Sequence, residues 1–151
     1  MRQAKSESPT IVTRMSAEDV TEVCYARFVL ESAGLSEVWE STRTSLAARM
    51  SEVVHQMQLA ADKGDLAGIV EADTDLHRLI VTAAGHPRLV ELWSTMNGQM
   101  GALMRSSLER QHIDLSEAVT RHSKLVRAFR RKDPQSAVAA LREHYLDPTH
   151  G

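Results

Sequence analysis

Cysteine, proline and glycine are scarce in this chain, and each shortage excludes a class of protein. Cys24 is the only cysteine, so an internal disulfide is impossible and any metal site would have to use nitrogen and oxygen ligands. Its neighbours follow a helical pattern, which predicts that Cys24 is a small core residue. The few glycines and prolines fall where helices would end, and no alternating β pattern is visible.

Long apolar runs and long basic runs are also missing. No stretch approaches the roughly 18 apolar residues of a membrane span, and the N-terminus lacks the apolar core of a signal peptide. We therefore expect a soluble, cytoplasmic protein without membrane contact. The formal net charge is -2, whereas a DNA-binding module usually carries a positive stripe. This chain is not expected to hold DNA by itself.

What is present is the composition of one helical domain. Hydrophobic residues make up 42% of the 151 residues and charged residues 25%, a globular balance. Residues 1–15 are predicted to be a polar tail or a linker remnant, and residues 16–151 a single domain. Six helices with short connections predict an all-α antiparallel bundle. The expected helices are 16–34, 36–63, 65–85, 87–110, 116–132 and 134–146.

Three of these helices each place ionisable side chains on an apolar face. Asp73 and His77 lie four residues apart within the apolar stripe of the third helix, one above the other. His122 falls between Val119 and Leu125 on the fifth helix, and His144 follows Leu141 on the last. Three histidines and one carboxylate are thus predicted to point into the core of the same bundle.

A divalent transition metal would explain this set. A buried carboxylate is costly without a partner, and buried imidazoles need their nitrogens satisfied. Such ligands suit zinc or nickel first, then manganese or iron, and suit calcium or magnesium poorly. The alternative from the residues alone is ordinary: satisfied core histidines and a hydrogen-bonded Asp73–His77 pair. The other four histidines share no spacing with this set and are predicted to lie on the surface: His55, His86, His112 and His150.

Three stretches of the chain resemble the FCD effector domain of the GntR family of transcriptional regulators, in its FadR-like branch. They are an opening helix with Ala26-Arg-Phe-Val-Leu-Glu31, the segment Asp73-Thr-Asp-Leu-His77-Arg78 with the turn after it, and His122 followed by Ala140-Leu-Arg-Glu-His144. The resemblance covers about residues 16–146. The chain departs from the family's usual pattern at Leu76, where an aromatic is common, and at His86, where Asn is common.

The resemblance implies a function as well as a fold. It implies that a metal ion is held by Asp73, His77, His122 and His144, with open positions that face a cavity for a small organic acid. It also implies a homodimer, and Arg27 as the partner of an effector carboxylate, where a planar guanidinium would suit bidentate binding. The winged helix-turn-helix of such regulators is not found in this sequence, so we expect DNA contact only through a separate domain.

Two other functions are compatible with the same residues. A metal-dependent hydrolase or lyase could use the cation to activate water, although no further inward acid or base is evident as a proton carrier. A purely structural metal could brace the bundle. We expect a sensor rather than an enzyme.

Overall fold

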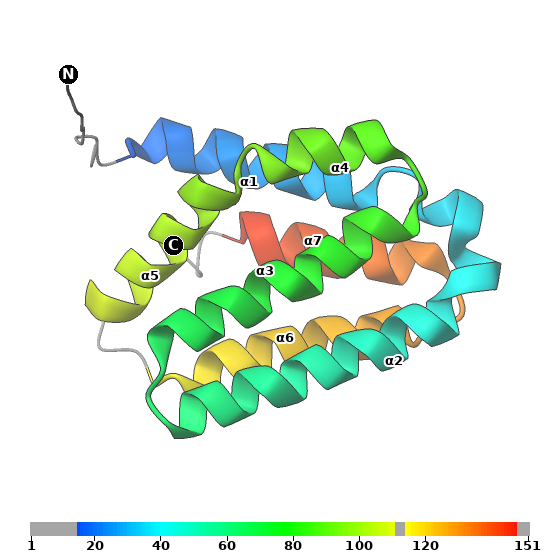
Figure 1. Ribbon diagram of the computed structural model, residues 1–151. Coiled ribbons are helices and arrows are strands. Elements are labelled where there is room, and N and C mark those ends of the chain that lie inside the picture. The colour runs from blue at the N-terminus through cyan, green and yellow to red at the C-terminus, as the bar shows by residue number, and fades with distance from the viewer. Residues whose placement is uncertain (1–14, 111–113, 148–151) are drawn as a thin grey trace, which may run out of the picture.

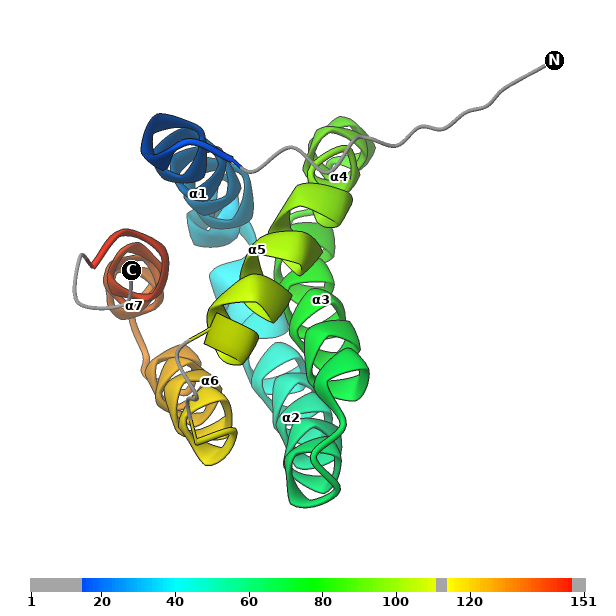
Figure 2. The ribbon, with the colours of Figure 1, turned by 90° about the vertical axis from the view of Figure 1, so that its left-hand side faces the viewer.

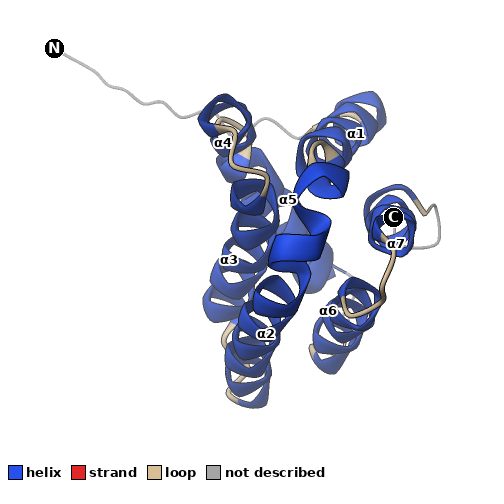
Figure 3. Ribbon diagram, turned by 90° about the vertical axis from the view of Figure 1, so that its right-hand side faces the viewer, coloured by secondary structure: helices blue, strands red, loops and turns tan. Residues whose placement is uncertain are grey.

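The computed structural model describes residues 15–110 and 114–147, and within them every regular element is a helix (Figure 3). This confirms the predicted all-α bundle. The helices are α1 (Ala17–Ser32), α2 (Leu35–Asp62), α3 (Leu66–Ala83), α4 (Pro87–Ser94), α5 (Asn97–Arg110), α6 (Ser116–Phe129) and α7 (Pro134–Leu146).

The helices surround a common interior, with α5 across one end. The long helix α2 lies along α3 and α6, and α7 packs between α1 and α6 (Figure 1). Seen from the end, α5 crosses the middle of the ring formed by the other helices (Figure 2). This arrangement leaves α5 facing the inner sides of α3, α6 and α7.

Three of the helices begin at side-chain caps. The Ser16 hydroxyl accepts a hydrogen bond from the Asp19 amide, and the Asp19 carboxylate accepts one from the Ser16 amide. The Asp65 carboxylate accepts from the Gly68 amide, and Asp133 caps α7 with Pro134 in the first turn. These caps satisfy amides that a helix leaves without internal partners, and those on α3 and α7 set where the helices carrying Asp73, His77 and His144 begin.

One predicted helix is divided in two. The sequence predicts a single helix over residues 87–110, but α4 ends at Ser94 and α5 begins at Asn97. The Thr95 hydroxyl donates to the Leu92 carbonyl over 2.6 Å, and Arg27 holds the Asn97 side chain at 3.1 Å. Side chains that bond to nearby backbone or to distant residues compete with helix continuation. The apolar period runs through the break, so periodicity alone did not reveal it.

Two apolar clusters stabilise the bundle, and Asp73 and His122 fall between them along the chain. The first contains Trp39 and Phe129, whose rings lie 5.7 Å apart, and the second contains Met57 and Ile69. On α3, Ala72 belongs to the second cluster and Leu76 to the first, with Asp73 between them. Hydrophobic burial on both sides therefore fixes the polar residues at the level where the clusters meet.

No helix among the described residues is long and apolar enough to span a membrane. The predicted tail, residues 1–15, lies outside the described residues except for Met15.

Candidate metal centre and its cavity

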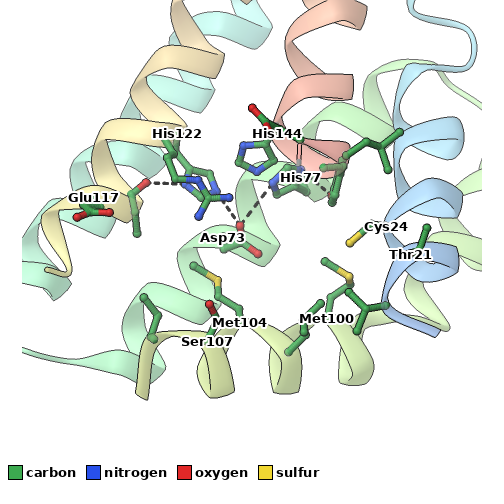
Figure 4. Close-up of a pocket in the computed structure, with 18 of the residues that line it drawn as sticks. Thr21, Cys24, Asp73, His77, Met100, Met104, Ser107, Glu117, His122 and His144 are labelled. Carbon is green, nitrogen blue, oxygen red and sulfur yellow. Dashed lines mark hydrogen bonds and ion pairs between the residues drawn. The ribbon is translucent and has the colours of Figure 1, made fainter. Parts of the chain in front are cut away.

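The four predicted ligands come together in the interior from three helices. Each offers one nitrogen or oxygen atom, and these atoms all lie within 4.8 Å of one another. In Figure 4, His122 and His144 approach from α6 and α7, and Asp73 lies below them on α3. We call these residues the ligand cluster: Asp73, His77, His122 and His144.

The Asp73 carboxylate faces two of the three histidines of the ligand cluster. Its Oδ1 lies 2.7 Å from Nε2 of His122 and 3.4 Å from Nε2 of His77. The His144 ring centroid is 5.0 Å from that of His77 and 4.8 Å from that of His122. Three imidazoles and one carboxylate therefore share a single small volume.

Behind His77 lies a second carboxylate, Glu31 of α1, which is fully buried. His77 donates its Nδ1–H to Oε1 of Glu31 over 2.7 Å. The other oxygen, Oε2, accepts from Trp93 Nε1 at 2.8 Å and from the Tyr145 hydroxyl at 2.5 Å, and Arg27 Nε lies 3.3 Å from it. Burial first, and then the charge of Glu31, raise the pKa of Tyr145 well above its usual range, so the phenol stays a donor.

The outer bonds of the histidines direct their inner nitrogens toward Asp73. His122 donates Nδ1–H to the Ala118 carbonyl over 2.7 Å, as His77 does to Glu31. An imidazole in its neutral form carries one proton, so with that proton on Nδ1 each ring can present the lone pair of Nε2 to a cation. Burial, and then the proximity of the other two histidines, His122 and His77, lower the pKa of His144 well below its ordinary value. His144 is therefore neutral and able to act as a ligand.

This donor set fits a divalent transition metal. The Nε2 atoms of His122 and His77 both face the Asp73 carboxylate. A nitrogen lone pair and a carboxylate oxygen are both acceptors, so a proton or a cation is needed between them. Zinc binds imidazole nitrogen and carboxylate oxygen at about 2.0–2.2 Å, so ligands around one ion lie at most about 4 Å apart. The observed spread of up to 4.8 Å is close to this. When bound, such an ion supplies Lewis acidity and open positions for a ligand atom.

Without a metal, a proton fills the same role at His77. Burial alone would lower the pKa of His77, but the carboxylates of Glu31 and Asp73 outweigh it and raise the pKa to about 9. Burial would raise the pKa of Asp73, but His77 and His122 hold it well below its usual value. Metal-free protein is thus stabilised by an imidazolium between two carboxylates.

The ligand cluster forms one wall of a cavity of about 540 Å³, a size usual for small-molecule sites. Thr21 and Cys24 of α1 line it, with Met100, Met104 and Ser107 of α5 (Figure 4). Cys24, predicted to be a core residue, is only partly buried here. Because five helices contribute to the wall, a bound molecule would contact most of the bundle at once.

The remaining predicted residues lie elsewhere. Arg27 is fully buried, its guanidinium lies 4.0 Å from the Trp93 ring centre, and it does not line the cavity. Its predicted contact with an effector therefore stays a prediction. His55 and His86 are exposed as predicted, whereas His112 and His150 lie outside the described residues.

Sequence reasoning missed the residues that support the ligand cluster from outside. The sequence placed Glu31 only within a family-like stretch, and it linked neither Trp93 nor Tyr145 to the ligand cluster. A signal was available for Glu31, because Arg27 and Glu31 stand four residues apart on a helix with apolar neighbours. The sequence spacing does not indicate that Trp93 and Tyr145 contact Glu31, because they lie 62 and 114 residues after it.

Comparison with known proteins agrees with the geometry. The model of the FCD domain family matches residues 22–147. A curated relative is the "Probable D-xylose utilization operon transcriptional repressor" of Paenarthrobacter nicotinovorans, 25% identical over 143 residues that make up 93% of this chain. The match covers 62% of that relative's length. No solved structure matches the chain.

The Glu31–His77 hydrogen bond yields a first prediction. Glu31→Gln should weaken metal binding about 10- to 100-fold, because outer-shell partners orient a ligand histidine and raise its basicity. Competition with a chelator measures this, with circular dichroism to verify helix content. Glu37→Gln is the matched control, since Glu37 is exposed and lies 3.5 Å from His86, which is also exposed. Tyr145→Phe should weaken binding less. Unchanged affinity in a folded Glu31→Gln protein would contradict this role.

The raised pKa of His77 yields a second prediction. A histidine whose folded pKa exceeds its unfolded value stabilises the fold at low pH and loses that contribution as the pH rises. Metal-free protein should therefore lose stability between pH 6.5 and about 9, measured as a falling urea midpoint in the presence of chelator. The urea midpoint of metal-loaded protein should show no such fall, because the ion takes the place of the proton and protons compete with it for the ligand nitrogens. A midpoint of metal-free protein that is constant or rises over this interval would refute the assignment, and His77→Gln should flatten the slope.

Proposed function

Because this chain belongs to the FCD domain family, we propose that it is the metal-dependent ligand-sensing domain of a GntR-type transcriptional regulator. The ligand is a small organic acid that completes the coordination of a divalent ion held by the ligand cluster. Zinc or nickel is the expected ion, with manganese or iron next. Regulation of DNA would pass through a separate winged helix-turn-helix domain.

The convergence of the two Nε2 lone pairs on Asp73 carries this proposal. His122 and His77 have both committed their outer Nδ1–H groups, to Ala118 and Glu31. Their inner nitrogens and the neutral His144 then surround one carboxylate beside a cavity. This arrangement provides ligands on one side of an ion and leaves the cavity side for a ligand from solution.

A carboxylate is the expected ligand on chemical grounds. An oxygen anion binds a divalent cation directly, and the cavity is lined largely by apolar side chains that would surround the remainder of a small molecule. Such pockets usually combine apolar walls with a few polar groups that fix orientation.

Ligand binding could act on the whole bundle. The cavity is bounded by residues of α1, α3, α5, α6 and α7, so an acid bound to the ion would favour one packing of α1 and α5 over another. A ligand shifts a conformational equilibrium by its difference in affinity for the two states. We propose that a homodimer transmits this shift to attached DNA-binding domains. The repressor named above, a longer protein, gives the type of regulator in which such a domain occurs.

Elemental analysis gives the test. Protein purified without chelator should contain about one transition metal ion per chain, as a four-residue site of this kind implies. His77→Ala and His144→Ala should lose the ion, while His86→Ala, on the surface, should keep it. Metal should raise the melting temperature, and small carboxylates should raise it further only when metal is present.

The other outcomes separate the alternatives. If the protein is metal-free and neither zinc nor nickel raises its melting temperature, the proposal fails. If metal stabilises the fold but no carboxylate binds, the ion is structural. If a bound acid is recovered chemically changed, the domain is an enzyme rather than a sensor.

A further inference from the structure

One arginine of the cavity wall has a buried donor atom without a hydrogen-bond partner in the described part of the chain. Arg121 precedes His122 on α6 and lines the same cavity as the ligand cluster. It is partly buried, and its Nε atom is fully buried without a hydrogen-bond partner among the described residues. A buried polar atom without a partner is costly, so the site gains free energy when an acceptor enters.

No described residue accepts a hydrogen bond from the Nε atom of Arg121. Glu117 lies one helical turn earlier and also lines the cavity, but it is exposed and no ion pair joins it to Arg121 in the described structure. Arg27, by contrast, is bonded to Glu31 and Asn97. Of these two arginines, Arg121 is therefore the one available to a molecule in the cavity.

The charge around the ligand cluster indicates the kind of molecule. A divalent ion offset by Asp73, the one carboxylate of the ligand cluster, keeps one positive charge, and Arg121 adds a second cationic group to the same wall. Glu117 and Asp147 also line the cavity and offset part of this charge, Glu117 from an exposed position. The Glu31 carboxylate does not reduce this positive charge, because Arg27 offsets it.

We propose that Arg121 binds a carboxylate of the effector, and that the domain selects small dicarboxylates over monocarboxylates of the same length. One carboxylate completes the coordination of the ion, and the other accepts from the Arg121 guanidinium. This inference rests on the proposed metal-dependent sensing function. Guanidinium suits the task because its planar fork matches a carboxylate and its hydrogen bonds are charge-assisted.

Calorimetry on the zinc-loaded protein tests the proposal. The probes are malonate, succinate and adipate, each beside the monocarboxylate of equal carbon number: propionate, butyrate and hexanoate. At least one dicarboxylate should bind about tenfold or more tightly than its monocarboxylate, as expected for a hydrogen bond between charged groups. Arg121→Gln should lose most of that difference and keep its zinc. Arg121→Lys should retain part of it.

The matched control is Arg127→Gln, which removes the same charge from the exposed side of α6 and should bind like the wild-type protein. Circular dichroism verifies that each variant is folded. If Arg121→Gln binds every acid as the wild type does, or if monocarboxylates bind as tightly, the inference is overturned while the metal site stands. If no acid binds the zinc-loaded protein, both the inference and the proposed ligand class fail. If the wild-type protein holds no zinc, the proposed function fails as well.

Discussion

The contact on which the rest of the site depends is that between the Asp73 carboxylate and two imidazole nitrogens. His122 Nε2 lies 2.7 Å from Asp73 Oδ1, and His77 Nε2 lies 3.4 Å from the same atom. Their outer nitrogens are fixed by Ala118 and Glu31. Only positive charge can hold these groups together in the interior. That charge is a proton in the metal-free protein and, in our account, a metal ion in the functional one.

The surrounding residues hold these nitrogens in position. Glu31 holds His77 in place, and three donors hold Glu31: Arg27, one turn earlier on the same helix, and the distant Trp93 and Tyr145. Because Trp93 belongs to α4 and Tyr145 to α7, the position of His77 depends on helices at two sides of the bundle. A ligand that changes the packing around the cavity would therefore act on the ion and on the helices together.

The sequence predicted the helices and the ligand cluster because both follow local rules. Asp73 and His77 share a helix face by their spacing, and His122 and His144 interrupt apolar stripes of their own. The break between α4 and α5 was missed, since Thr95 and Asn97 end the helix by side-chain bonds that the apolar period does not report. Glu31 and Arg121 were missed as functional residues. The burial of Glu31 and the buried Nε atom of Arg121 result from the packing of separate helices, which the sequence pattern does not show.

X-ray absorption at the zinc edge of the metal-loaded protein tests the central claim most directly. The account predicts a first shell of nitrogen and oxygen at about 2.0–2.2 Å, with outer-shell scattering from three imidazole rings. Cys24 lines the same cavity, so a sulfur atom at about 2.3 Å would show that the thiol, not the ligand cluster alone, holds the ion. Fewer than three imidazoles in the spectrum would likewise contradict the assignment.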